Sequence, residues 1–214
     1  MEVLVPFASE EPKTRLAGVL EPDERTAFAR AMLVDVLDAV RSAGHLPRVL
    51  ATAAVDVDAP VTVDDRPLSE AVNAQFAASF DVDDAPTDRL TAGPVAVVMA
   101  DLALATPAAI DRLCGTEGDV VLAPGRGGGT NAIVTRHPDF RVDYHGTSYL
   151  DHQAIAAEIG ATISVVDSVR LATDVDERAD LVEVLVHGDG RSRTFLEDAG
   201  FTLETTGGRV RVSR

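Results

Sequence analysis

A lysine and an arginine follow the first apolar segment of the chain. Residues 3–5 (Val-Leu-Val) are typical of a short buried strand, and Lys13 and Arg15 lie in the loop that follows it. Ligand sites of parallel sheets form at the carboxyl ends of strands, and lysine supplies a compact charge suited to phosphate. Lys13 is the single lysine of a chain that otherwise uses arginine. We therefore predict that Lys13 and Arg15 bind a triphosphate; the alternative is that Lys13 is an ordinary surface lysine.

Acidic residues occur at two places where a divalent cation would be held. Asp101 ends the apolar segment 95–100, which is typical of a buried strand, so its carboxylate is expected at the same sheet edge as the two cations. Asp174 and Asp176 are two residues apart, so in an extended segment they face the same side. Mg²⁺ takes one or two carboxylates together with phosphate oxygens. We predict that Asp101 is a Mg²⁺ ligand, the alternative being an aspartate of a turn or a helix cap, and that Asp174 and Asp176 could share a metal. Alternatively, Asp176 caps a helix beginning near Glu177.

A glycine-rich segment, residues 125–131, lies between two predicted strands. Consecutive glycines let backbone N–H groups approach an anion closely. The segment is not a nucleotide-binding P-loop, because no Gly-Lys-Ser/Thr follows and a strand rather than a helix comes next. We expect it to bind a second anion, with Thr130 and Asn131 adding polar contacts; the alternative is a flexible surface loop.

These segments are expected to be held by an α/β fold. Apolar runs typical of strands alternate with helical patterns, which predicts a Rossmann-like, mostly parallel sheet with helices on both faces. A helix is predicted from Pro22 to a stop at Gly44, and another over residues 177–186. Residues 201–212, with Gly207-Gly208 at their centre, predict a C-terminal β-hairpin. We treat residues 1–214 as a single domain.

The charge balance excludes several classes of partner. The net charge is −16, from 35 acidic and 19 basic residues, so nucleic acid and anionic membranes would be repelled. An acid-rich, lysine-poor composition suits concentrated salt, where repulsion between charges is screened, and we expect a halophilic source; the alternative is an ordinary acidic protein of a mesophile. No apolar run is long enough to span a bilayer, no signal-peptide pattern is present, and Cys114 is the single cysteine. We therefore expect a cytoplasmic protein; its terminal hairpin is a candidate for pairing in a homodimer.

Several motifs together resemble the archaeal 2-phospho-L-lactate guanylyltransferases of coenzyme F-420 biosynthesis, over residues 3 to about 200. The matching stretches are Val5-Pro6-Phe7, Pro12-Lys13-Thr14-Arg15-Leu16, Glu24-Arg25, Phe28-Ala29-Arg30-Ala31-Met32-Leu33, Met99-Ala100-Asp101-Leu102, Ala123-Pro124-Gly125, Gly128-Gly129-Thr130-Asn131, Gly146-Thr147-Ser148 with His152, and Asp174-Val175-Asp176. Each is weak singly, but their order and spacing are specific. The chain departs from the family at Ala8, where a lysine is usual, and at Ala103, where a proline is usual.

The resemblance implies a GT-A-like (MobA-like) nucleotidyltransferase fold and a Mg²⁺-dependent reaction of GTP with 2-phospho-L-lactate. It implies Asp101, with Asp174 or Asp176, as metal ligands, and assigns catalytic roles to Lys13, Arg15 and Asp101. The residues expected to bind the nucleotide are Pro6, Lys13, Arg15 and Asn73. The residues expected to bind the phosphorylated acid are Thr130, Asn131, Gly146 and Ser148.

Two other readings of the sequence remain open at this point. One is a related nucleotidyltransferase whose acceptor is phosphoenolpyruvate, 3-phosphoglycerate, a sugar phosphate or molybdopterin. The other is a nucleotide-binding protein that does not catalyse a reaction, which the pairing of Lys13 with Asp101 disfavours.

Overall fold

The core of the protein is a seven-stranded sheet, seen in a computed structural model that describes residues 1–10, 12–81 and 93–214. The strand order is β3-β2-β1-β4-β6-β5-β7. The strands are β1 (Glu2–Phe7), β2 (Leu46–Ala51), β3 (Val61–Val63), β4 (Val95–Val98), β5 (Val120–Pro124), β6 (Thr130–Thr135) and β7 (Ile163–Val165). β6 runs antiparallel to β4 and β5, and the other pairs are parallel. The predicted mostly parallel sheet is confirmed.

The antiparallel strand follows from the length of its connection. Residues 125–129 alone join β5 to β6, and a loop this short can only join antiparallel neighbours, because a parallel neighbour needs a crossover of a dozen or more residues. The glycine-rich segment is therefore the turn of a hairpin, with Gly125 N–H donating to Gly129 O at 2.8 Å.

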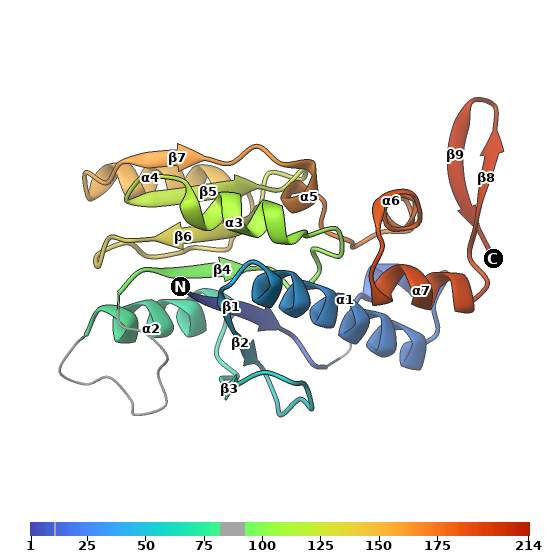
Figure 1. Cartoon of the computed structure of the whole chain (residues 1–214), viewed down its shortest axis with the longest axis horizontal. Coiled ribbons are helices and arrows are strands. Elements are labelled where there is room, and N and C mark those ends of the chain that lie inside the picture. Colours follow the sequence, from blue (N-terminus) through green and yellow to red (C-terminus); the bar gives the residue numbers. More distant parts are fainter. Residues whose placement is uncertain (11, 82–92) are drawn as a thin grey trace.

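Helices cover both faces of the sheet, as predicted (Figure 1). Helices α1 (Pro22–Ser42) and α3 (Pro107–Gly115) pack on one face and α2 (Leu68–Phe80) and α4 (Ser148–Glu158) on the other. Successive residues of a strand point to opposite faces, so Val3 and Val5 belong to the first hydrophobic cluster and Leu4 to the second. Strands covered on both sides are apolar throughout, which is why the sequence shows continuous runs instead of alternation.

Helix α1 has the boundaries that the sequence predicts. Pro22 occupies the first turn, and Glu21 and Glu24 form a capping box around it. Gly44, just beyond the helix, has φ 79°, a left-handed conformation that ends helices and favours glycine. This well-defined helix packs against the β1 face and supports the loop that carries Lys13.

The C-terminal third departs most from the prediction. After α5 (Val169–Ala172), helix α6 (Asp180–His187) begins three residues later than expected, because residues 177–180 form a turn closed by Asp180 N–H and Glu177 O. Helix α7 (Arg191–Asp198) was not predicted; its sequence is strongly polar, and it is held by Asp35 of α1, which accepts from the N–H groups of Arg191 and Ser192.

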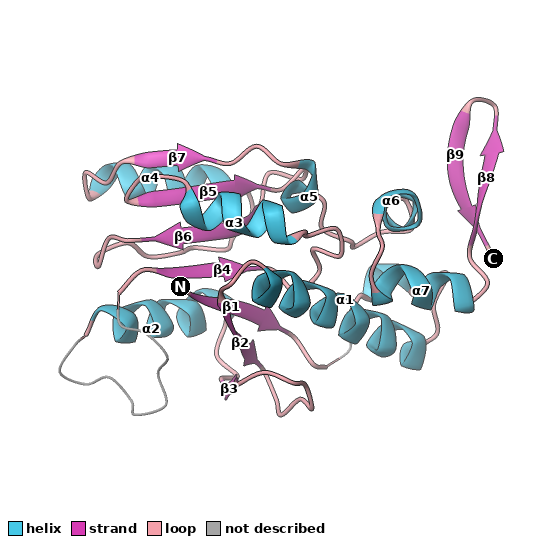
Figure 2. Cartoon of the chain, viewed as in Figure 1, coloured by secondary structure: helices cyan, strands magenta, loops and turns pink. Residues whose placement is uncertain are grey.

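The predicted C-terminal hairpin is confirmed as β8 (Thr202–Thr206) and β9 (Arg209–Ser213). Gly207 and Gly208 both have positive φ, as a two-residue hairpin turn of this kind requires. The hairpin projects from the body of the protein, on the far side of α6 and α7 from the sheet (Figure 2).

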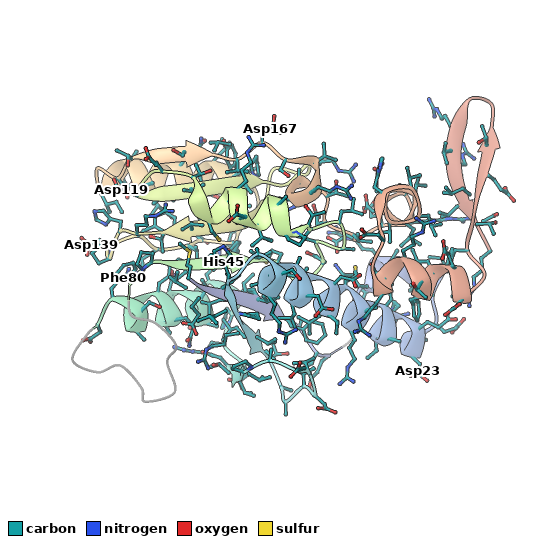
Figure 3. All side chains as sticks on the ribbon, in the orientation of Figure 1. Asp23, His45, Phe80, Asp119, Asp139 and Asp167 are labelled. Carbon is teal, nitrogen blue, oxygen red and sulfur yellow. The ribbon has the colours of Figure 1, made fainter. Side chains whose placement is uncertain are left out.

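The surface carries the negative charge. Acidic side chains such as Asp23, Asp139 and Asp167 lie on the outline of the molecule and point into solvent (Figure 3). In the part of the chain that the structure describes, no helix has the length and apolarity needed to cross a membrane.

Candidate active site

Lys13 lies between two of the predicted acidic residues. Its Nζ is 2.7 Å from Asp101 Oδ2 and 2.7 Å from Asp176 Oδ1. Arg15 is close by, with Nη1 3.7 Å from Asp176 Oδ2, and its side chain is largely exposed. The structure thus brings together residues that are 88 and 163 positions apart in the sequence. A pocket of about 250 Å³ opens beside them, and Pro6 and Ala8 contribute to its wall.

The backbone places each of these charges at one edge of the sheet. Lys13 has φ 56°, which directs the chain into the short 3-10 helix η1 (Thr14–Leu16), whose Leu16 is fully buried. Asp101 follows β4, and its carbonyl accepts the N–H of Val175 at 3.2 Å. That bond aligns the acidic segment 174–176 beside the end of β4. Leu16, Leu102 and Val175, each next to one of the charged residues or within one position of it, are fully buried and fix the three segments of the site.

Burial and charge act in opposite directions on this cluster. Burial alone would lower the pKa of Lys13, but Asp101 and Asp176 together raise it above the ordinary value for lysine. Burial raises the pKa of Asp101, and the Lys13 ammonium opposes that rise. Lys13 is therefore a permanent cation, and Asp101 is a carboxylate that depends on a neighbouring cation for its charged form.

The donor set fits Mg²⁺, although it is not a preformed cage. Among the described residues, no group of three or more His, Cys, Asp or Glu side chains is arranged to hold a metal ion. Mg²⁺ needs fewer, because it takes one or two carboxylates and completes its shell with phosphate oxygens and water. Asp101 Oδ1 is buried and has no hydrogen-bond partner, which leaves an unsatisfied hard oxygen at the expected position.

Asp174 is tied to the glycine-rich hairpin and not to Lys13. Asn131 Nδ2 donates to Asp174 Oδ1 at 3.1 Å and to Leu171 O at 3.0 Å. A Cβ at Gly125 would lie 2.5 Å from Asn131 Oδ1, so only glycine allows this close approach. Asn131 therefore has a structural function that the sequence did not reveal: it holds the acidic segment against the hairpin.

Thr130 and Ser148, both predicted to bind the acceptor, form a buried network with His152. Thr130 N–H donates to Ser148 Oγ at 3.0 Å, and Asp143 N–H donates to His152 Nε2 at 3.0 Å. His152 Nδ1 therefore carries the proton and donates to Thr130 Oγ1 at 2.8 Å. Burial lowers the pKa of His152 to about 4, so the ring is neutral at pH 7. Gly146, the fourth predicted acceptor residue, is exposed and has φ 51°.

Because Thr130 belongs to this buried network, its substitution is expected to lower the stability of the protein. Thr130→Val leaves the buried N–H of His152 without an acceptor, and we expect the free energy of unfolding to fall by about 1–3 kcal/mol. Chemical denaturation followed by circular dichroism measures this loss, and Thr205→Val on the exposed hairpin is the matched control. Unchanged stability with a raised KM for the acceptor would instead show that Thr130 contacts the substrate directly.

The expectation that Asn73 reads the nucleotide base is not supported by its position. Its Nδ2 donates to Val142 O at 2.9 Å and its Oδ1 accepts from Val142 N–H at 2.8 Å. Both ends of the amide are therefore engaged in joining α2 to the backbone at residue 142. The sequence places Asn73 on a predicted helix but does not indicate the segment that this helix packs against.

A second pocket, of about 190 Å³, adjoins the first and was not anticipated. The two share Pro6, Phe7, Ala8 and Met99, and the second adds Asp64 and Arg66, among others. Phe7 pairs with Ala51 and Ala51 with Val63, so the residues that follow these three strands lie in one row. The alignment of strand ends could have indicated Asp64, but a three-residue strand gives only a weak signal in the sequence.

Solved structures show the same fold. A putative nucleotide-diphospho-sugar transferase from Desulfovibrio desulfuricans superposes with a TM-score of 0.71, at 16% identity, over 92% of this chain and 94% of the other. The bifunctional IspDF from Campylobacter jejuni superposes with a TM-score of 0.55, at 12% identity, over 95% of this chain and 56% of the other. At these identities the likeness concerns the fold alone, and it confirms the predicted nucleotidyltransferase fold.

Sequence relatives identify the family. A 2-phospho-L-lactate guanylyltransferase of Halomicrobium mukohataei is 61% identical over 214 residues, and the alignment covers all of both chains. One from Methanoregula boonei is 48% identical over 99% of this chain and 94% of the relative. The relatives are mostly haloarchaeal, in keeping with the acidic composition. A model described as "Guanylyl transferase CofC like" matches residues 1–214. The chain therefore belongs to the CofC-like guanylyl transferase family.

Proposed function

We propose that this chain condenses GTP with 2-phospho-L-lactate to give lactyl-2-diphospho-5′-guanosine and pyrophosphate. The observation that carries the proposal is Lys13, held between Asp101 and Asp176 beside a pocket at the carboxyl edge of the sheet. The full-length match to named guanylyltransferases supports the same reaction and the same acceptor.

In this reaction an oxygen of the acceptor phosphate attacks the α-phosphorus of GTP in line. The new O–P bond forms as the bond from the α-phosphorus to the bridging oxygen of pyrophosphate breaks. No general base is needed, because the acceptor phosphate is already an anion at neutral pH. Transfer of this kind depends on positioning and on neutralising charge more than on covalent chemistry. In this proposal Lys13 and Arg15, which lie beside Asp101 and Asp176, neutralise the leaving pyrophosphate.

Asp101, with Asp174 or Asp176, would hold Mg²⁺. When bound, the ion supplies charge neutralisation on the phosphate oxygens. Ala8 replaces the lysine usual in the family, which leaves Lys13 and Arg15 as the cations of the first loop. We place the reaction in the cytoplasm.

The second pocket is proposed to hold the guanine base. β3 and β4 are separated by two strands, so Asp64 and Asp101 are three strand spacings apart, about 14 Å, which suits a base at one end and the α-phosphate at the other. Arg66 donates to Asp64 through its side chain and its backbone N–H. This pairing lowers the pKa of Asp64, so the carboxylate is ionised. Arg66 makes two bonds to Oδ1 and one to Oδ2, which leaves Oδ2 able to accept from guanine N2–H.

Replacing Asp64 is expected to change nucleotide preference. Inosine lacks the N2 amino group, so the wild-type enzyme should use GTP better than ITP, and Asp64→Ala should reduce that preference by about tenfold. The ratio of kcat/KM for the two nucleotides measures this. Asp58→Ala, on the exposed loop before β3, is the control. A preference for GTP that survives in Asp64→Ala would remove Asp64 from base recognition.

The proposed reaction is tested on the purified chain in molar KCl with Mg²⁺. GTP and ATP are each combined with 2-phospho-L-lactate, phosphoenolpyruvate or 3-phosphoglycerate. Release of pyrophosphate and the mass of the product are measured together. The expected result is a guanosine diphosphate diester formed fastest with 2-phospho-L-lactate. Formation of no nucleotide product from any pair would overturn the proposed function, and a faster reaction with another acid would correct the acceptor.

A further inference from the structure

The carboxylate of Asp180, the first residue of α6, accepts three hydrogen bonds. Its Oδ2 accepts the backbone N–H groups of Asp176 at 3.1 Å and Glu177 at 2.8 Å. Its Oδ1 accepts from Arg126 Nη2 at 2.9 Å. Only 17% of its side chain is exposed, so these bonds are partly shielded from water.

The partners of Asp180 belong to different halves of the site. Asp176 binds Lys13, which is on the side proposed for the triphosphate. Arg126 lies in the glycine-rich hairpin turn, and its backbone N–H donates to Ala172 O at 3.1 Å. Asp180 is therefore a bridge between the segment that presents the acids and the turn proposed for the acceptor.

We infer that Asp180 is a positioning residue for guanylyl transfer: its carboxylate fixes Asp176 and Arg126 relative to each other. The inference builds on the proposed function. An acid in the first turn of a helix that reaches back to preceding N–H groups, as in a capping box, accounts for the two backbone bonds. It does not account for a charge-assisted bond to Arg126, 54 residues away. In-line transfer between two bound anions requires their sites to keep one relative placement, and a bond between the segments supplies it.

Arg126 gives this bridge a chemical purpose. The acceptor carries a carboxylate in addition to its phosphate, and it approaches a protein of net charge −16. The Arg126 side chain is 49% exposed, and Asp180 engages only one of its terminal nitrogens. A guanidinium has five N–H donors, so donors remain for the acceptor carboxylate while Asp180 fixes the group in place.

Two substitutions of Asp180 distinguish its effect on Arg126 from its effect on Asp176. Asp180→Asn keeps an oxygen for the backbone N–H groups but removes the charge that holds Arg126; the KM for 2-phospho-L-lactate should rise about tenfold, with the KM for GTP unchanged. Asp180→Ala also frees the backbone at Asp176, so kcat should fall about tenfold in addition. Arg126→Ala should reproduce the asparagine variant, and combining it with Asp180→Asn should add little.

Glu183→Gln is the matched control, because Glu183 is a carboxylate of the same helix that pairs with His187 on the surface; its kinetic constants should equal those of the wild type. Assays are run where circular dichroism shows each variant to be folded. An unchanged acceptor KM in both Asp180→Asn and Arg126→Ala overturns the assignment of Arg126. A wild-type kcat in Asp180→Ala overturns the positioning of Asp176.

Hydrogen exchange tests the bridge without substrates. The amides of Asp176 and Glu177 should be protected in the wild type and should exchange at least about tenfold faster in Asp180→Ala. Equal exchange in both proteins would overturn the bridge itself. Absence of guanylyl transfer by a wild-type enzyme with protected amides would overturn the proposed function and leave the structural bridge intact.

Discussion

Lys13→Ala is expected to lower guanylyl transfer by at least about a hundredfold, because loss of a charge-stabilising group in a desolvated site costs roughly 3 kcal/mol in the transition state. Lys13 faces the proposed triphosphate pocket and lies 2.7 Å from each of two carboxylates. Its removal takes away a cation for the leaving pyrophosphate and leaves Asp101 and Asp176 without the charge that separates them. Steady-state release of pyrophosphate measures the effect.

Lys13→Arg should also lower the activity, because the planar guanidinium group of arginine does not replace a compact ammonium group between two carboxylate oxygens. Arg30→Ala, which removes an exposed cation from α1, is the control for a general change in net charge and should be as active as the wild type. If the activity of Lys13→Ala stayed within a few-fold of the wild type, Lys13 would have no part in catalysis. Circular dichroism of each variant separates loss of catalysis from loss of fold.

Those parts of the fold that depend on local pattern were predictable. Helix α1 begins at Pro22 and ends before Gly44 because of the backbone preferences of these two residues, and Gly207-Gly208 forms the hairpin turn. Helix α7 was missed because its sequence is polar and its N-terminus is satisfied by Asp35, 156 residues earlier in the chain. The local sequence does not indicate a stabilising partner that is so distant in the chain.

The same distinction holds for the site. Lys13 and Asp101 could be placed together because each follows a buried strand, and parallel strands end at one edge of the sheet. The residues that support them could not: Asn131 holds Asp174, and Asp180 holds Asp176. In the sequence, Asn131 after glycines predicts a ligand contact, and Asp176 before a predicted helix indicates a metal ligand or a cap. Their contacts depend on how β6, α5 and α6 pack, which periodicity does not specify.

The second large effect is expected at Asp101. Asp101→Asn should reduce Mg²⁺-dependent transfer to below about one percent of the wild type, because an amide oxygen lacks the charge that a hard divalent cation needs. The substitution keeps the shape of the side chain and leaves the backbone bond from Val175 N–H to Asp101 O in place. With the amide oxygen facing Lys13 Nζ, as Oδ2 does now, the NH₂ group takes the position of the buried Oδ1, which has no protein partner. The protein should therefore stay folded while the metal site is weakened.

Two measurements are needed to interpret the Asp101 variant. Activity is titrated with Mg²⁺, and binding of Mn²⁺ in the presence of GTP is followed by electron paramagnetic resonance, which reports on the metal even where turnover is lost. Asp111→Asn, an exposed acid on α3, is the matched control. If Asp101→Asn kept the wild-type dependence on Mg²⁺, the metal would lie with Asp174 and Asp176 instead. Asp101 would then act only by positioning Lys13. Its substitution should in that case raise the KM for GTP, because displacement of Lys13 would weaken a contact with the triphosphate that is also made in the ground state.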